Sequence, residues 1–141
     1  MYHRVIIVGN LGRDPEMRYT PQGTPVTTFT VAANRKWTNA DGTPGEETTW
    51  FRVTAWRRMA ETCNQYLSKG RQVLVEGWLK PDPETGGPRI WTGNDGVARA
   101  SFEVTARIVK FLGTRGEGVA VEPGVTLEEP PPEESEEELP F

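Results

Sequence analysis

The sequence predicts an all-β domain, a small five-stranded barrel with one short helix between its third and fourth strands, followed by an acidic tail. Three observations predict this fold class. Segments with alternating or β-branched residues recur up to residue 112, a single segment spaces its apolar residues three or four apart, and 15 glycines and 12 prolines provide many turns. A chain of 141 residues is long enough for one such domain with its own core.

The first two strands are expected at residues 5–8 and 25–37. Residues 5–8 form an apolar run that ends at Gly9 and Asn10, a pair typical of a turn. Residues 11–22 are polar and irregular, so we expect a loop there. Residues 25–37 are rich in β-branched side chains, which favour a long strand, and the turn-forming residues that follow predict a hairpin.

The third strand is expected at residues 48–57, where side chains alternate in character on the way back from this hairpin. Phe51, Val53 and Ala55 form one face and are expected in the core. The opposite face is aromatic and basic, and it consists of Trp50, Arg52, Thr54 and Trp56.

A short amphipathic helix is expected at residues 58–68, where the apolar period changes. Its apolar residues lie three or four positions apart and are Met59, Ala60, Cys63, Tyr66 and Leu67. Gly70 is expected at the helix C-cap. The fourth strand, residues 71–80, then has one apolar side that consists of Val73, Val75 and Leu79.

The fifth strand is expected at residues 99–112, after a glycine- and proline-rich loop or loose hairpin at residues 81–96 that holds Trp91. Its predicted inner face consists of Phe102, Val104, Ala106 and Ile108. Five strands with a helix after the third is the element order of the OB-fold, a barrel that often binds oligonucleotides. An SH3-like or another small barrel stays open as an alternative, because element order alone does not define topology.

Charge divides the chain into two parts. All 16 lysines and arginines and 11 of the 20 acidic residues lie within residues 1–116, which gives that part a net charge of +5. Residues 117–141 hold the other 9 acidic residues and no basic residue. We therefore expect an OB-fold domain over residues 1–115 that faces nucleic acid, and a disordered acidic tail over residues 116–141, where apolar residues are too few to support folding.

Several function classes are disfavoured by what the sequence contains. Cys63 is the only cysteine, so the chain can form no internal disulfide, and one thiol cannot build a zinc site. His3 is the only histidine, and no glycine-rich phosphate loop with its lysine is present. Neither a signal segment nor a membrane-spanning apolar run is evident. We expect a cytoplasmic, nucleoid-associated protein that is not an enzyme and has no cofactor or metal.

The tryptophans are the strongest candidates for binding. Trp50 and Trp56 share a strand face with Arg52, while the opposite face already supplies the core, so neither indole is needed to fill it. Aromatic rings beside cations suit a single-stranded nucleic acid, because every base has a face that can stack and cations contact phosphates without reading sequence. A packed core position is the alternative for any one tryptophan.

Two further tryptophans have cations nearby in the sequence. Trp37 follows Arg35 and Lys36, and Trp91 comes two residues after Arg89. The predicted DNA-binding set is therefore Trp37, Trp50, Trp56 and Trp91 for stacking, and Arg35, Lys36, Arg52 and Arg57 for phosphates. The neighbours of Trp78 favour a packed surface or a subunit contact over DNA.

The acidic run ends in an apolar tip, which consists of Glu136, Glu137, Glu138, Leu139, Pro140 and Phe141. A tail that only improves solubility has no need of Leu139 and Phe141. A peptide that docks into an apolar pocket ringed by Arg or Lys would use the ring, the α-carboxylate and the preceding glutamates together. We expect the tip to bind partner proteins, with a solubility tail as the alternative.

Residues 5–19 closely resemble the opening of bacterial single-stranded DNA-binding proteins, and further similar segments follow at residues 49–53, 60–70 and 73–77. The resemblance covers about residues 3–113 and the acidic tip. It implies stacking of single-stranded DNA on the four tryptophans named above, a homotetramer, and a tip that recruits replication, recombination and repair proteins. The chain departs from the family's pattern at the inserted residues 81–87, shortly before Trp91.

Two other functions stay open on the residues alone. One is an adaptor whose barrel binds protein or structured RNA and whose tail is the active element. The other is an accessory barrel in replication restart, against which the Leu139-Pro140-Phe141 end argues.

Overall fold

The computed structural model describes residues 1–113. The predicted disordered tail at 116–141 and its tip lie outside the described residues. Seven strands and one helix are present in the described part, in the order β1 (Val5–Leu11), β2 (Glu16–Tyr19), β3 (Pro25–Thr38), β4 (Pro44–Trp56), α1 (Arg57–Tyr66), β5 (Gln72–Leu79), β6 (Arg89–Thr92) and β7 (Ala98–Leu112).

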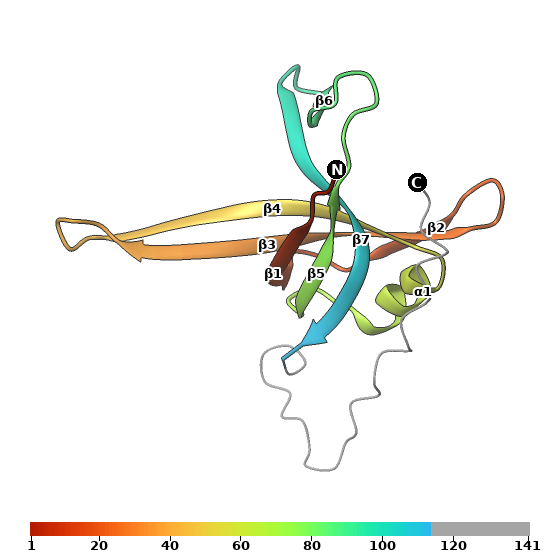
Figure 1. The fold of residues 1–141 in the computed structure, drawn as a ribbon, viewed down its shortest axis with the longest axis horizontal. Helices are drawn as coiled ribbons and strands as arrows, with labels where there is room; N and C mark the ends of the chain where they lie inside the picture. The colour runs from red at the N-terminus through yellow and green to blue at the C-terminus, as the bar shows by residue number, and fades with distance from the viewer. Residues whose placement is uncertain (114–141) are drawn as a thin grey trace, which may run out of the picture.

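Five of these strands close into a barrel (Figure 1). Neighbouring strands follow the order β1, β5, β7, β4 and β3, and β3 pairs with β1 again to close the ring. All pairs in the ring are antiparallel except β4 with β7, which is parallel. The short strands β2 and β6 pair outside the ring, with β3 and β7 respectively. The predicted five-stranded barrel with a helix after its third strand is therefore confirmed.

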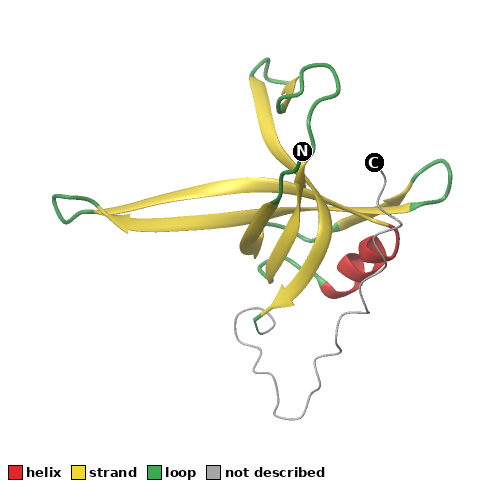
Figure 2. Ribbon diagram, viewed as in Figure 1, coloured by secondary structure: helices red, strands yellow, loops and turns green. Residues whose placement is uncertain are grey.

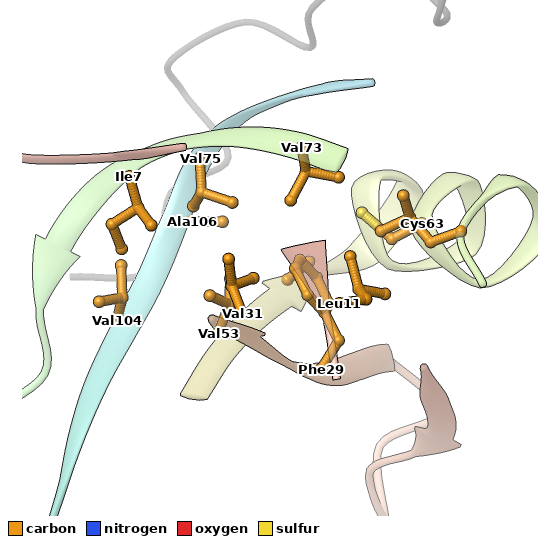
Figure 3. Packing of buried hydrophobic residues seen from close by; sticks show 12 residues of the cluster. Ile7, Leu11, Phe29, Val31, Val53, Cys63, Val73, Val75, Val104 and Ala106 are labelled. Carbon is orange, nitrogen blue, oxygen red and sulfur yellow. The ribbon is translucent and has the colours of Figure 1, made fainter. Parts of the chain in front are cut away.

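Valines from four strands fill the centre of the barrel. Val31, Val53, Val73, Val75 and Val104 are fully buried, and Figure 3 shows them pointing into the space between the strands. The predicted core face of β4 is confirmed at Val53 and Ala55, while Phe51 packs against the cluster from a half-buried position.

The helix covers one end of the barrel (Figures 1 and 2), and it joins β4 to β5. Its predicted apolar side is confirmed at Ala60 and Cys63, which are both buried. The buried hydroxyl of Thr27 on β3 donates a hydrogen bond of 2.6 Å to the main-chain oxygen of Ala60, which ties the helix to the barrel. This bond satisfies a polar group that would otherwise be buried without a partner.

Gly70 does not cap the helix as predicted. The helix ends at Tyr66, and the N–H of Leu67 donates to the oxygen of Cys63. Gly70 has a φ of 86° three residues beyond that cap, and its N–H donates to the oxygen of Leu11. Its left-handed backbone therefore serves the turn into β5 rather than the helix end.

The expected turn at Gly9 and Asn10 is wrong, because β1 continues through both residues to Leu11. Gly9 is required there for close approach: a Cβ on it would clash with the main-chain oxygen of Ala32 on β3. The strand β2 lies within residues expected to form a loop. It was missed because its four residues include only one aliphatic side chain, Met17, and because it forms by pairing with β3.

The inner face of β7 differs from the prediction at both ends. Val104 and Ala106 are buried as expected, but Phe102 is 54% exposed because it lies at the start of the β4–β7 pairing. Between Ala106 and Ile108 the register with β5 shifts by one residue, so that Val109 and Phe111 pack against the core in place of Ile108. Such a bulge reverses the side-chain alternation beyond it.

Leu79 follows the alternation of Val73 and Val75 on β5 as expected, but at the end of the strand it is exposed. Hairpins of the sheet extend beyond the barrel (Figure 1), and the β3–β4 hairpin and the β6–β7 hairpin are called arms below. The hairpin of β3 and β4 projects far from the barrel, and the β6–β7 arm leaves it in a different direction. The loose hairpin expected around Trp91 is confirmed as this second arm, in which Trp91 pairs with Arg99.

Candidate nucleic-acid interface

The outer face of β4 carries the aromatic and basic residues that the alternation predicted. Trp50, Arg52 and Trp56 point away from the core residues Val53 and Ala55, and Trp50 is 53% exposed. The β3 residues beside Trp50, Arg52 and Thr54 on this face are small, namely Ala32, Thr30 and Thr28. Small neighbours leave the indole ring of Trp50 open to solvent.

The ring of Trp50 rests on Gly12, which follows the end of β1. A Cβ on Gly12 would lie 2.5 Å from Cζ3 and 2.9 Å from Cη2 of Trp50, closer than such atoms can approach. The missing side chain of Gly12 therefore leaves the space that the six-membered ring of Trp50 occupies.

The structure places Trp37 on the opposite face of the β3–β4 hairpin from Trp50. The register is continuous and pairs Trp37 with Gly45 and Trp50 with Ala32, so Trp37 shares the face of core residues such as Val31. Arg35 lies on the same face as Trp37, and its guanidinium carbon is 5.2 Å from the Trp37 ring centroid.

Trp37 is held by further contacts near the tip of the hairpin. Its Nε1 donates a hydrogen bond of 2.9 Å to Oδ1 of Asn39, and its ring covers Gly45, where a Cβ would clash. Lys36 alternates to the other side and shares the face of Trp50. The predicted set on this hairpin thus divides between two faces.

The turn of the hairpin is stabilised by Asp41. Hydrogen bonds from the hydroxyl and the main-chain N–H of Thr43 hold the pKa of Asp41 below its usual value. The turn of the β6–β7 arm is built similarly, since Arg99 and the N–H of Val97 lower the pKa of Asp95. In both turns the ionised carboxylate accepts these hydrogen bonds, which hold the residues of the turn together.

Trp91 lies on β6 with a guanidinium over its ring. The guanidinium carbon of Arg89 is 5.2 Å from the ring centroid, a distance typical of a cation–π contact. Nε of Arg89 is 3.5 Å from Oε1 of Glu103, and Nε of Arg52 is 3.9 Å from the same oxygen. Glu103 therefore brings the Trp91 arm next to the outer face of β4.

Trp56 and Arg57 lie where β4 turns into α1. Trp56 is half-buried and shares the Trp50 face, whereas Arg57 is exposed and has a φ of 59°. A left-handed backbone is uncommon for a residue with a side chain. The strand therefore ends one residue earlier than predicted, and Arg57 begins the helix.

Trp78 lies on the same outer surface as the β4 face. Thr105 of β7 pairs with Thr54 on one side and with Trp78 on the other, and Trp78 is half-buried. The sequence could not show this, because β5 and β4 are separated in the sheet by β7. The order of these strands cannot be derived from the residues of β5 alone.

Three residues that matter here were not in the predicted set. The sequence offered a hint for Arg89, which lies two residues before Trp91 and so on the same side of a strand. It offered none for Gly12 and Glu103.

The tip at 136–141 lies outside the described residues. Within residues 1–113, no three His, Cys, Asp or Glu side chains gather as metal ligands. In the same part of the chain, no helix is long and apolar enough to span a membrane.

The sequence of this chain is similar to those of known proteins. The model of the single-strand binding protein family matches residues 2–112. A single-stranded DNA-binding protein of Neisseria meningitidis serogroup B is 39% identical over 115 residues, which are 82% of this chain and 62% of the relative. One from Thermotoga maritima is 41% identical over 111 residues, 79% of this chain and 74% of the relative. The chain thus spans about three-fifths of the Neisseria relative's length.

A solved structure is similar as well. The small single-stranded DNA-binding protein from Streptomyces coelicolor superposes with a TM-score of 0.65 at 27% identity, covering 81% of this chain and 97% of that one. The family match covers most of the chain, and the resemblance in the sequence is thereby confirmed. The chain belongs to the single-strand binding protein family.

Proposed function

We propose that this chain binds single-stranded DNA without reading its sequence. The observation that carries the proposal is Trp50, a large indole that is 53% exposed on a rigid strand, seated on Gly12 and next to Arg52. An exposed ring held on a rigid scaffold presents a stacking surface at little entropic cost, and a cation beside it suits the phosphate backbone. The names of the relatives support the same function.

In this proposal, bases stack on Trp37, Trp50, Trp56 and Trp91. Phosphates pair with Arg35, Lys36, Arg52 and Arg57. Because every base has a face to stack, such a surface tolerates any sequence. The division of the tryptophans over two faces of the hairpin means that one strand of DNA must pass around the hairpin to meet all of them. We assign no catalysis, cofactor or metal to the chain.

The acidic tail is proposed to have two roles. Residues 136–141 would recruit replication, recombination and repair proteins, since Leu139, Pro140 and Phe141 follow three glutamates. The nine acidic residues after position 116 would also compete weakly with DNA for the basic surface. A chain that ends at Arg115 should then bind DNA at least as tightly as the full chain, and deletion of Phe141 should abolish partner capture in pull-downs.

We also propose that the chain forms a homotetramer and that it binds DNA of the nucleoid in the cytoplasm. Ile6, 66% exposed, and Val8 point away from the barrel on β1, and exposed apolar residues of this kind favour an interface. Sedimentation equilibrium of the full chain tests the assembly, for which a mass four times the 15.7 kDa of one chain is expected.

The function is tested by titrating intrinsic tryptophan fluorescence with oligo(dT) at several salt concentrations, with duplex DNA as the control. Stacking should quench the indole emission strongly, binding should weaken as salt rises, and duplex DNA should quench little. Absence of quenching by oligo(dT) would refute the proposal and favour an adaptor that binds protein.

A further inference from the structure

Glu103 lies on the outer surface of β7, where the β6–β7 arm leaves the barrel. In the parallel pairing its register partner is Arg52 of β4. Its side chain is only 15% exposed, and its main-chain oxygen accepts a hydrogen bond of 2.8 Å from the N–H of Lys80. The residue therefore lies, largely buried, at the junction between the β4 face and the arm.

One oxygen of this carboxylate faces two guanidinium groups. Oε1 of Glu103 is 3.9 Å from Nε of Arg52 and 3.5 Å from Nε of Arg89. Both distances exceed those of a short charge-assisted hydrogen bond, so the carboxylate attracts both cations without closing tightly on either. In both ion pairs the carboxylate oxygen faces Nε of the guanidinium, and the two terminal amino groups are bonded to the carbon beyond that atom. Those terminal groups are the ones that could meet phosphates.

Arg89 extends this arrangement to an indole. Its guanidinium carbon lies 5.2 Å from the ring centroid of Trp91, and β6 pairs with β7 off the path of the barrel. The ion pairs through Glu103 therefore connect a strand outside the barrel to β4. Without the carboxylate, two like charges would face each other and repel.

We propose that Glu103 is a positioning residue for DNA binding. Its carboxylate holds Arg52 and Arg89 by their Nε atoms, so that their terminal amino groups and the Trp91 ring form one array beside Trp50. The inference rests on the proposed function of binding single-stranded DNA. It gives an acidic residue a role in binding an acidic ligand, whereas a simple charge argument makes Glu103 a competitor of phosphate.

The test replaces the carboxylate by an amide of the same shape. Glu103→Gln is compared with Glu76→Gln in the full chain. Glu76 also pairs with an arginine, at 3.6 Å from Arg4, but its neighbours in the sheet are Ile6 and Ile108, whereas β6 pairs with residues 98–101 of β7. Each variant is titrated with oligo(dT) over a series of salt concentrations. Urea unfolding of each variant establishes that it is folded under the conditions of the titration.

Glu103→Gln is expected to weaken binding by about three- to tenfold, in line with the modest strength of partly exposed ion pairs. The dependence of the affinity on salt should also become shallower, because each phosphate contact that is lost lowers the slope by about 0.7. Glu76→Gln should bind as the unchanged chain does, or slightly more tightly. Any other result for Glu103→Gln, above all tighter binding with a steeper slope, overturns the proposal.

A second comparison separates positioning from a general structural effect. In the background of Arg89→Gln, one of the two groups that Glu103 holds is already absent, so Glu103→Gln should weaken binding much less than in the unchanged chain. An equal loss in both backgrounds would contradict positioning. If the unchanged chain itself fails to bind oligo(dT), the proposed function fails. If it binds and Glu103→Gln binds equally well, only the role of Glu103 fails.

Discussion

The indole of Trp50 lies against Gly12, at a place where even a methyl group would come within 2.5 Å of the ring. Gly12 follows the end of β1, whereas Trp50 lies in the middle of β4, and the two meet because β3 pairs with both strands. The barrel therefore makes room at Gly12 for the six-membered ring of Trp50, while 53% of this residue stays exposed.

Replacement of Gly12 by Ala should displace the Trp50 ring and weaken the binding of single-stranded DNA. The ring is at the surface and can move, so we expect a loss of stability below about 1 kcal/mol, as for other surface substitutions. Affinity for oligo(dT) is the measurement, and Gly87→Ala, where a Cβ has room, is the control. Unchanged affinity of Gly12→Ala would show that this space is not needed.

Trp37 and Trp50 should contribute to binding at different lengths of DNA, because they lie on opposite faces of the hairpin. An oligonucleotide of about 8 nucleotides, within the range that one OB-fold covers, should respond to Trp50→Ala much more than to Trp37→Ala. A longer strand that can pass around the hairpin should respond to both. Equal effects of the two variants on the short oligonucleotide would contradict this arrangement.

Gly77→Ala should destabilise the fold. Gly77 lies at the register shift between β5 and β7, and a Cβ there would clash with the main-chain oxygen of Thr105, which cannot move without breaking the pairing. A loss of about 1–3 kcal/mol is expected, as for other overpacked sites, and urea unfolding measures it. A midpoint equal to that of the unchanged chain would show that the strands can separate freely at this point.

Cys63 should be unreactive in the folded protein. Burial raises the pKa of its thiol from 9.0 to about 12, because the thiolate would lose its hydration among apolar side chains. Below about pH 9 the thiol is neutral in both the folded and the unfolded chain, so it costs the fold nothing. As the pH rises from about 9 toward about 12, the unfolded chain ionises first and the fold loses stability. Iodoacetamide should therefore label Cys63 at about pH 9 only after urea unfolding. Rapid labelling of the folded chain would contradict the burial.

Much of the fold could be predicted from local patterns. The alternation in β4 separates Val53 and Ala55 from Trp50 and Arg52, and the change of period identifies the helix. Local patterns do not predict which side chains face the core where that depends on pairing with another strand. Ile108 has the right parity for the core, but the register shift against β5 gives that place to Val109 and Phe111.

The candidate site was predictable residue by residue but not in its arrangement. Alternation within one strand shows which residues share a face of that strand, so Trp50 and Trp56 could be grouped. Whether Trp37 joins them depends on the register across the hairpin, which its turn determines. Gly12 and Glu103 belong to the site only through contacts between strands distant in sequence, and neither residue type indicates such a role.

The most direct test of the account is the affinity of Trp50→Ala for oligo(dT), measured by the anisotropy of a labelled strand. Tyr2→Ala is the matched control, since Tyr2 is also an exposed ring with a guanidinium carbon, that of Arg4, at 5.2 Å, yet lies outside the β4 face. If Trp50 stacks on a base, its loss should weaken binding by about 1–3 kcal/mol, while Tyr2→Ala binds normally and both variants unfold at the usual urea concentration. Equal affinity of Trp50→Ala and the unchanged chain would contradict the central claim that this face binds single-stranded DNA.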